Sequence, residues 1–292
     1  MGKALADAFD ICRQTFAEAD EALQQPLSEL IFNGPAETLT LTEHTQPAIL
    51  TMSVAVCRLL EQRGVTPSFV AGHSLGEYSA HVAAGTFAFA DAVRLVRNRG
   101  RYMQEATPVG SGAMAAILGL DEAGVNKACE EAAQGDVVSA ANLNGGGQIV
   151  IAGSAAAVAR AGERAKALGA KRAIPLQVSA PFHCALMKPA ELRLAPELRS
   201  VAARDPRVPV VANVDAQPKR TAQASIEALI QQVASPVRWE DVILRLASEG
   251  VTRYVEVGPG KALSGMIKRI VSGATIHNVE GPDDLSALEV LS

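Results

Sequence analysis

A serine flanked by two glycines is the first candidate for chemistry. The segment Phe69–Ala80 reads FVAGHSLGEYSA, and Ser74 stands at the centre of a G-x-S-x-G pattern between Gly72 and Gly76. An apolar, strand-like run enters this pattern and a helix-like run leaves it. In that setting the pattern predicts a tight turn that exposes the serine hydroxyl as a nucleophile. The backbone N–H of Leu75 then begins the helix and is free to receive a developing oxyanion.

A serine nucleophile needs a base to accept its proton, and two histidines are candidates. His183 follows the segment where two predicted domains meet, which is a common place for an active-site cleft. His277 lies in a late strand-like run and suits the chain order Ser, Asp, His of an α/β-hydrolase, with Asp215 or Asp241 as the acid. The residues favour His183 and leave His277 open. The other three histidines are poorly placed to act as the base. His73 is expected on the opposite face of its extended segment from Ser74, His81 lies too far along the helix, and His44 lies in a polar turn.

An arginine on an apolar helix face is the second candidate. Helical periodicity over Asp91–Glu105 puts most arginines on one polar stripe, but Arg99 falls among the apolar side chains. A guanidinium in such a place is costly unless it is paired. Its planar fork suits bidentate binding of a carboxylate. That carboxylate belongs either to a protein Asp or Glu or to an acidic substrate, and both interpretations stay open.

The segments around these residues predict a large α/β domain. Helical periodicity covers Lys3–Leu23, about Thr45–Arg63 and the helix of Arg99. Strand-like runs follow late in the chain, at Val208–Val214 and Arg253–Val257. Helices that alternate with short strand-like runs are typical of the α/β class.

A different pattern occupies the middle of the chain. Between Ala113 and Ser179 the runs alternate as β-α-β-β-α-β, which is the order of a ferredoxin-like unit. Asn144 and the three glycines after it predict the hairpin between the two middle strands. We therefore expect a small domain at 110–180, inserted into a large domain that is formed by 1–109 and 181–292.

Composition limits the classes of function. The 292 residues are 48% hydrophobic and carry a net charge of −4, so no basic surface indicates a nucleic-acid partner. No apolar run approaches the roughly 20 residues of a membrane span. The four cysteines are widely scattered without a C-x-x-C pair, which indicates reduced thiols and a cytoplasmic protein. We expect no metal and no cofactor.

Taken together, the motifs resemble the malonyl-CoA:acyl-carrier-protein transacylase family of bacterial fatty-acid synthesis. They run in the order of that family through nearly the whole chain: GHSLGEYSA at 72–80, DAVRLVRNRG at 91–100, GAMAAILGL at 112–120, APFHCALMKPA at 180–190 and VEVGPGKAL at 255–263. The resemblance implies the fold of that family, which is an α/β-hydrolase-like large domain with a parallel sheet and an inserted ferredoxin-like small domain.

The resemblance also implies roles for individual residues. Ser74 resembles the nucleophile of the family and His183 its base. Arg99 is placed like the arginine that binds the malonyl carboxylate. Gln232 matches the residue whose backbone carbonyl orients the catalytic histidine in place of a triad acid. Phe182 resembles the pattern of malonyl-selective members, in which bulk beside the histidine disfavours an α-methyl branch.

The sequence departs from the family at its start. Family members begin with a strand that ends in Gly-Gln-Gly-Ser-Gln, and its first glutamine helps to complete the oxyanion hole. Here the chain opens in the helix that follows, and Gly-Gln-Gly does not occur. An internal strand pairs on both edges, so we expect the chain without it to be poorly stable and to transfer acyl groups slowly. Adding such a strand is expected to restore both properties.

The resemblance implies an acyltransferase that moves a malonyl group from malonyl-CoA to the phosphopantetheine thiol of acyl carrier protein, through an acyl-serine intermediate. The only prosthetic group is then the phosphopantetheine of the partner protein. Two alternatives stay open. One is a serine esterase or thioesterase that uses His277, in which Arg99 is structural. The other is a truncated, non-catalytic relative that binds acyl carrier protein or CoA.

Overall fold

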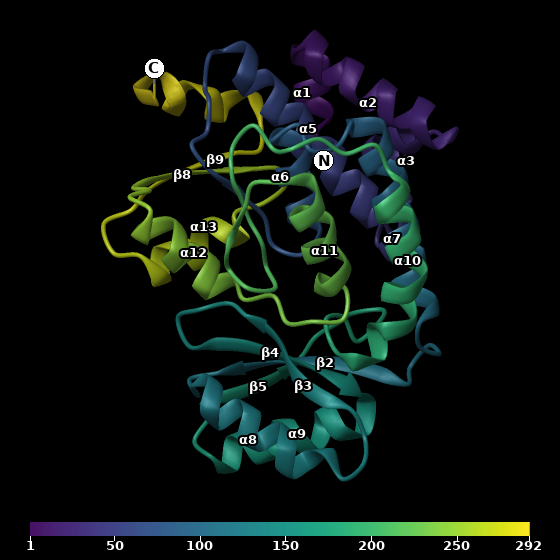
Figure 1. Ribbon diagram of the computed structural model, residues 1–292, viewed down its shortest axis with the longest axis vertical. Helices are drawn as coiled ribbons and strands as arrows, with labels where there is room; N and C mark the ends of the chain where they lie inside the picture. Colours follow the sequence, from purple (N-terminus) through teal and green to yellow (C-terminus); the bar gives the residue numbers. More distant parts are fainter. Residues whose placement is uncertain (292) are drawn as a thin grey trace.

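The computed structural model describes the backbone of residues 1–291 and the side chains of residues 1–286. Figure 1 shows a large unit of helices and short strands above a smaller unit in which a sheet lies on two helices. The helices of the first part of the large unit are α1 (Lys3–Ala8), α2 (Asp10–Leu23), α3 (Leu27–Asn33), α4 (Ala36–Leu39), α5 (Thr42–Gln62), α6 (Leu75–Ala83) and α7 (Phe89–Glu105).

The second part of the large unit follows the small one in sequence and packs back against the first. Its helices are η1 (Ala185–Met187), α10 (Lys188–Ser200), α11 (Ala222–Gln232), α12 (Trp239–Ser248), α13 (Ala262–Ile270) and η2 (Pro282–Leu291). Helix α10 packs on α7, and β8 and β9 lie beside α13 (Figure 1). Residues 75–105 and 185–200 therefore meet in space although the small unit separates them in sequence.

Short parallel strands organise the large unit. Strand β1 (Val70–Ala71) pairs in parallel with β6 (Val210–Val211), which pairs antiparallel with β7 (Pro218–Lys219). A separate parallel pair joins β8 (Arg253–Val257) to β9 (Thr275–Val279). The parallel pairing of β1 with β6 brings residues 72–74 beside residue 213, since both strands end at the same edge.

The small unit has the predicted ferredoxin-like arrangement. Its elements are β2 (Gly112–Leu118), α8 (Glu122–Ala133), β3 (Val138–Leu143), β4 (Gln148–Ser154), α9 (Ala155–Ala167) and β5 (Arg172–Pro175). The strands pair antiparallel in the order β3-β4-β2-β5, and both helices cover one face of the sheet (Figure 1). The fold class expected from the sequence is confirmed. The domain limits at 109/110 and 180/181 stay a prediction.

Some elements differ from the sequence prediction. The helix expected over Lys3–Leu23 is broken at Phe9, which has an extended backbone (φ −133°, ψ 124°) between α1 and α2. The break lets Leu5 and Phe16 reach the same core, which a continuous periodic pattern does not reveal. The strand expected over Val208–Val214 is also longer than β6, which has two residues.

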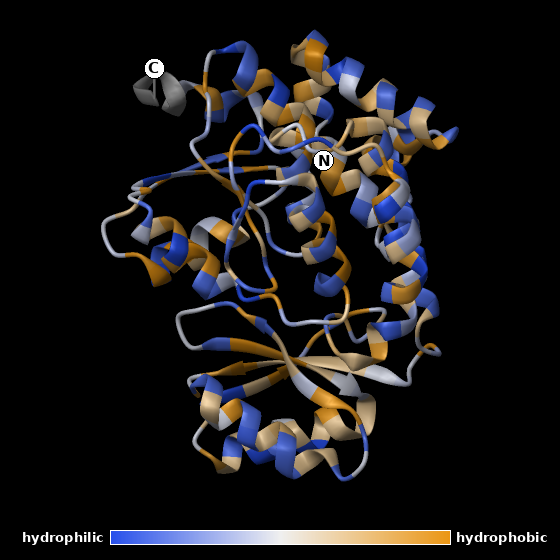
Figure 2. Cartoon of the chain, viewed as in Figure 1, coloured by the Kyte–Doolittle hydropathy of each residue, from blue (hydrophilic) through white to orange (hydrophobic). Residues whose placement is uncertain are grey.

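Apolar side chains of α2, α5, α6, α7 and α10 form the main core. Figure 2 shows hydrophobic and hydrophilic residues alternating along the helices, and mostly hydrophobic residues along strands of the small sheet. Helix α5 is buried along most of its length and lies against both α2 and α7. Within the described part of the chain, no helix has the length and apolar character that spanning a bilayer requires. Helices α6, α7 and α11 all contribute side chains to the main core.

Candidate active site

The turn between β1 and α6 holds Ser74 in a strained conformation. Its backbone has φ 53° and ψ −108°, which a residue with a side chain rarely adopts. Asn213, just past the end of β6, fixes this turn: its Oδ1 accepts the N–H of Ser74 at 2.7 Å, and its Nδ2 donates to the carbonyl of Gly72 at 2.8 Å. The parallel pairing of β1 with β6 brings the two segments together. The hydroxyl of Ser74 is thereby held at the edge of the sheet.

His183 lies directly against this hydroxyl. Its Nε2 is 2.6 Å from Ser74 Oγ, and its Nδ1 is 3.0 Å from the backbone carbonyl of Gln232 at the end of α11. A carbonyl oxygen only accepts hydrogen bonds, so Nδ1 carries the proton and Nε2 has the free lone pair. The ring is therefore oriented to accept the proton of Ser74.

Burial keeps this histidine neutral. The His183 side chain is 3% exposed, and burial lowers its pKa to about 3, with the positive charge of Arg99 acting in the same direction. The imidazole is neutral over the whole physiological pH range, and Nε2 stays available as an acceptor. This environment suits a base that must be unprotonated before the reaction begins.

Arg99 is the third group at the hydroxyl. Its guanidinium is 2% exposed, and one nitrogen, Nη2, donates to Ser74 Oγ at 3.0 Å and to Gln232 Oε1 at 3.0 Å. The other terminal nitrogen, Nη1, donates to Gln46 Oε1 at 2.7 Å. Its Nε–H is buried without a partner among the described residues. The sequence placed Arg99 on the apolar face of α7, and its hydrogen-bond partners there are amides and a hydroxyl rather than a carboxylate.

A buried network joins these groups. The Nε2 of Gln232 donates to the carbonyl of Ser74 at 3.0 Å and to Oε2 of Glu77 at 2.8 Å. Glu77 also accepts the backbone N–H of Asn213 at 3.0 Å. Gln232 thus contacts His183 through its backbone carbonyl and Ser74, Arg99 and Glu77 through its side chain. One residue links the base, the nucleophile and the guanidinium.

The two remaining candidates lie close by in the chain. Leu75 is the first residue of α6, where N–H groups have no partner within the helix, and its N–H donates to no atom of the described residues. Phe182 is half-buried and packs on both the main core and the apolar cluster at the sheet of the small unit. Its ring therefore bridges the two units next to His183.

His277 lies elsewhere, in β9, where it is paired with Val255. The two candidate acids for a triad with His277 both form ion pairs with other residues, Asp215 with Lys219 and Asp241 with Arg238. His73 and His81 also bond away from the serine, to Asn144 and Thr86. Within the described chain, His183 is therefore the histidine that the fold brings to Ser74.

Three residues at the site were not identified from the sequence: Gln46, Glu77 and Asn213. Gln46 and Asn213 are neutral amides that lie 28 residues before and 139 residues after Ser74, so no local pattern marks them. Glu77 lies three residues after Ser74 in the quoted motif. A carboxylate in the first turn of a helix is ordinary, and only its complete burial distinguishes it.

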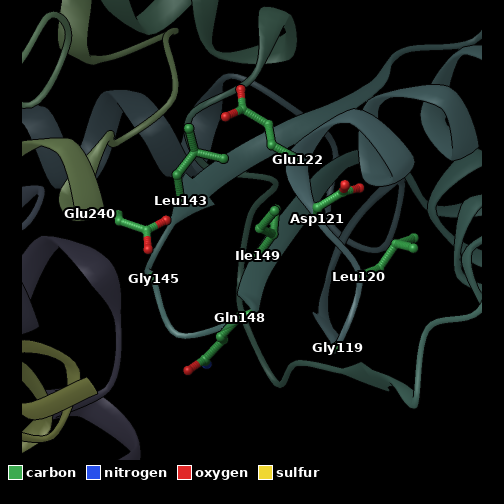
Figure 3. Close-up of a pocket in the computed structure, with 10 residues that line it drawn as sticks. Gly119, Leu120, Asp121, Glu122, Leu143, Gly145, Gln148, Ile149 and Glu240 are labelled. Carbon is green, nitrogen blue, oxygen red and sulfur yellow. The ribbon is translucent and has the colours of Figure 1, made fainter. Parts of the chain in front are cut away.

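A pocket lies away from these groups. Figure 3 shows a pocket of about 340 Å³ between the hairpin of the small unit and α12, with Asp121, Glu122 and Glu240 at its rim. None of its lining residues is hydrogen-bonded to the side chains of Ser74, His183 or Arg99. No described group of three or more His, Cys, Asp or Glu side chains is arranged to hold a metal ion. The candidate site therefore consists of the groups around Ser74.

Known proteins share both the sequence and this fold. The family model described as "Acyl transferase domain" matches residues 1–279. The malonyl CoA-acyl carrier protein transacylase of Escherichia coli K12 is 53% identical over 284 residues, which cover 97% of this chain and 92% of the relative. The corresponding protein of Bacillus subtilis is 52% identical over 272 residues, 92% of this chain and 86% of the relative.

A solved acyl carrier protein S-malonyltransferase from Vibrio cholerae superposes with a TM-score of 0.96 at 47% identity. The match covers 99% of this chain and 94% of that one. A malonyl-transacylase solved in complex with a type II polyketide acyl-carrier protein gives a TM-score of 0.97 at 48% identity, with the same coverage. With a family model over nearly its full length and relatives above half identity, this chain belongs to the acyl transferase domain family.

Proposed function

We propose that this protein is an [acyl-carrier-protein] S-malonyltransferase that moves malonyl groups from malonyl-CoA to acyl carrier protein for fatty-acid biosynthesis. The observation that carries the proposal is the position of one hydroxyl, Ser74 Oγ, between a neutral imidazole at 2.6 Å and a buried guanidinium at 3.0 Å. The first group supports nucleophilic attack and the second supports binding of an acyl group that ends in a carboxylate. The relatives named above bear the name of this activity.

In the first half-reaction, Ser74 Oγ attacks the thioester carbonyl of malonyl-CoA while His183 Nε2 accepts the hydroxyl proton. The N–H of Leu75 donates to the oxyanion of the tetrahedral intermediate. When the intermediate collapses, the C–S bond breaks, the sulfur of CoA takes the proton from His183, and malonyl-Ser74 remains. The backbone carbonyl of Gln232 keeps the proton of His183 on Nδ1 throughout.

In the second half-reaction, the phosphopantetheine thiol of acyl carrier protein replaces CoA. His183 accepts the thiol proton, the sulfur attacks malonyl-Ser74, and the proton returns to Ser74 Oγ as the ester bond breaks. The same groups therefore serve both halves of a ping-pong cycle. The enzyme itself needs no cofactor in this scheme, because the partner protein carries the phosphopantetheine.

Two residues select the acyl group in this proposal. Arg99 binds the malonyl carboxylate, for which its unpaired Nε–H is one available donor. Phe182, beside His183, limits the space for an α-methyl branch. The four free cysteines support a cytoplasmic location, since disulfides are rare in that compartment.

The esterase alternative requires His277 to act on Ser74, and the two residues are not hydrogen-bonded, whereas His183 and Ser74 are. The non-catalytic alternative gives no reason for the contact between the neutral imidazole of His183 and the hydroxyl of Ser74, or for the strained backbone of Ser74. Neither alternative has an observation of its own in its favour.

Labelled malonyl-CoA tests the proposal directly. With acyl carrier protein present, the label is expected to move to the carrier, and without it a malonyl adduct is expected on Ser74 in the intact protein. Ser74→Ala is expected to abolish the adduct, while the surface variant Ser248→Ala keeps it. Release of free malonate at the same rate with and without the carrier would indicate a hydrolase. An unmodified wild-type protein in both mixtures would indicate a binding protein.

A further inference from the structure

Among the described side chains, one Asp or Glu and one Lys or Arg are buried, Glu77 and Arg99. They are 0% and 2% exposed, and both belong to the network around Ser74. Burying either charge alone is very unfavourable, because the interior does not replace the hydration of an ion. The presence of one charge of each sign in the same network therefore indicates that each compensates the other.

The two charges do not touch but are connected by a single amide. Gln232 Oε1 accepts from Arg99 Nη2 at 3.0 Å, and Gln232 Nε2 donates to Glu77 Oε2 at 2.8 Å. The amide dipole thus points its negative end at the guanidinium and its positive end at the carboxylate. The second oxygen of Glu77, Oε1, has no partner among the described residues. Glu77 is consequently held as the counter-charge of Arg99 without occupying the place of a substrate carboxylate.

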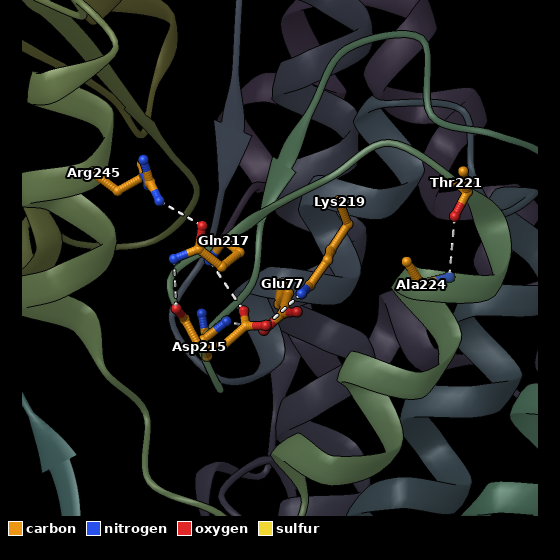
Figure 4. Close-up of polar contacts among 8 residues, drawn as sticks. Glu77, Asp215, Gln217, Lys219, Thr221, Ala224 and Arg245 are labelled. Atoms are coloured by element: carbon orange, nitrogen blue, oxygen red, sulfur yellow. Dashed lines mark hydrogen bonds and ion pairs between the residues drawn. The ribbon is translucent and has the colours of Figure 1, made fainter.

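Other charged and titratable groups around Glu77 come from several segments of the chain. Arg99 on α7 carries the positive charge. Tyr78 follows Glu77 on α6, and His183 is neutral. Asp215, in the loop after β6, adds a negative charge and is itself paired with Lys219 on β7 (Figure 4). Burial is the largest influence and raises the pKa of Glu77 to about 7, against the opposing effects of its hydrogen bonds and of Arg99.

Binding of a second carboxylate changes this balance. If Arg99 binds the malonyl carboxylate, as the proposed function has it, the buried network contains two carboxylates and one guanidinium. We propose that Glu77 takes up a proton from solvent when the malonyl group binds, so that Glu77 makes the preference for malonyl over uncharged acyl groups depend on pH. Protonated Glu77 still accepts from Asn213 and Gln232 through Oε2, and the new O–H lies on the oxygen that has no partner.

The sign of the effect follows from the proton count. Below pH 7 Glu77 already holds a proton and malonyl binding needs none. Above pH 7 the proton must be taken up, so kcat/KM for malonyl-CoA is expected to fall about tenfold for each pH unit. Acetyl-CoA has no carboxylate and should not show this loss. The malonyl-to-acetyl ratio at pH 8.5 is then about 30-fold below its value at pH 6.

The test measures acylation of Ser74 by intact-protein mass spectrometry from pH 6 to pH 9 with each acyl-CoA. Glu77→Gln keeps the size and one acceptor oxygen of the side chain but cannot ionise, and its malonyl-to-acetyl ratio is expected to be constant across this range. Glu131→Gln, on the surface of α8, is the matched control and should retain the wild-type fall. The comparison uses the shape of each profile, so a lower absolute rate in Glu77→Gln does not affect it.

A second measurement needs no variant. Mixing the wild-type protein with malonyl-CoA in weak buffer at pH 8, with a pH indicator, should show uptake approaching one proton per malonyl-serine formed, and acetyl-CoA should show none. A constant ratio in the wild type, a fall that persists in Glu77→Gln, or equal proton uptake with both substrates would overturn the inference. Arg99→Ala distinguishes a failure of this inference from a failure of the proposed function. If Arg99→Ala lowers kcat/KM equally for malonyl-CoA and acetyl-CoA, Arg99 does not bind the malonyl carboxylate and the proposed function itself is contradicted.

Discussion

The two glycines of the G-x-S-x-G turn look equivalent in the sequence, but the structure distinguishes them. A Cβ at Gly72 would lie 2.0 Å from both the carbonyl carbon and the oxygen of Gly76, and 2.6 Å from the backbone nitrogen of Glu77. A Cβ at Gly76 would meet nothing within 4 Å apart from its own helix. Only Gly72 is therefore required for the strand and the helix to approach, and Gly72→Ala and Gly76→Ala form a matched pair.

The size of the effect follows from these distances. Ordinary contact begins near 3.4 Å, so Gly72→Ala forces the first turn of α6 to move by about 1.4 Å. Overpacking of this kind costs roughly 1–3 kcal/mol, and each strained hydrogen bond of Ser74 to Asn213 or Gln232 adds about 1 kcal/mol. A loss of roughly 3 kcal/mol lowers Tm by about 5–10 °C in a protein of this length. A shift of 1 Å in the nucleophile also costs about 100-fold in rate.

The assay compares the two variants with the wild type by thermal melting and by the rate of malonyl-Ser74 formation. Gly72→Ala is expected to melt lower and to acylate at least about 100-fold more slowly. Gly76→Ala is expected to melt at or slightly above the wild-type temperature, because alanine favours a helix over glycine by up to about 1 kcal/mol. If both variants melt and acylate alike, the close approach at Gly72 does not control the turn and the reasoning is refuted.

Three further predictions concern individual side chains. His183→Ala should slow acyl transfer by roughly 10²–10⁴-fold, whereas His277→Ala should change it little; the reverse ranking would favour the esterase. Arg99→Ala should lower the malonyl-to-acetyl ratio of kcat/KM by about 30- to 1000-fold, which corresponds to roughly 2–4 kcal/mol, and an unchanged ratio would mean a structural arginine. Burial lowers the pKa of His81 to about 3, so the unfolded chain binds more protons than the folded one below pH 6.5 and stability falls as the pH drops. Tm measured from pH 7 to pH 4.5 should fall less in His81→Leu than in the wild type, and parallel curves would contradict this assignment.

The sequence by itself determined the elements that depend on local chemistry. The strand before Ser74 and the helix after it followed from the runs that flank G-x-S-x-G, and the β-α-β-β-α-β order followed from periodicity. Strand β8 begins and ends at the predicted residues. These features are local because turn geometry, helix periodicity and strand alternation act between residues only a few positions apart. The burial of Arg99 was also predicted, since its position on the apolar face of α7 is a local property.

The tertiary structure alone decided which groups meet at Ser74. His183 and Asn213 reach it from 109 and 139 residues away, through the packing of α10 on α7 and the pairing of β1 with β6. From the residues themselves His183 was favoured as the base for Ser74, but His277 could not be rejected. A short segment around a histidine does not show which distant segment it will contact in the folded chain. Gln46 and Asn213 carried no signal at all, since a neutral amide is compatible with both surface and core. Their roles come from distance and burial, and those are set by contacts between segments that are far apart in the chain.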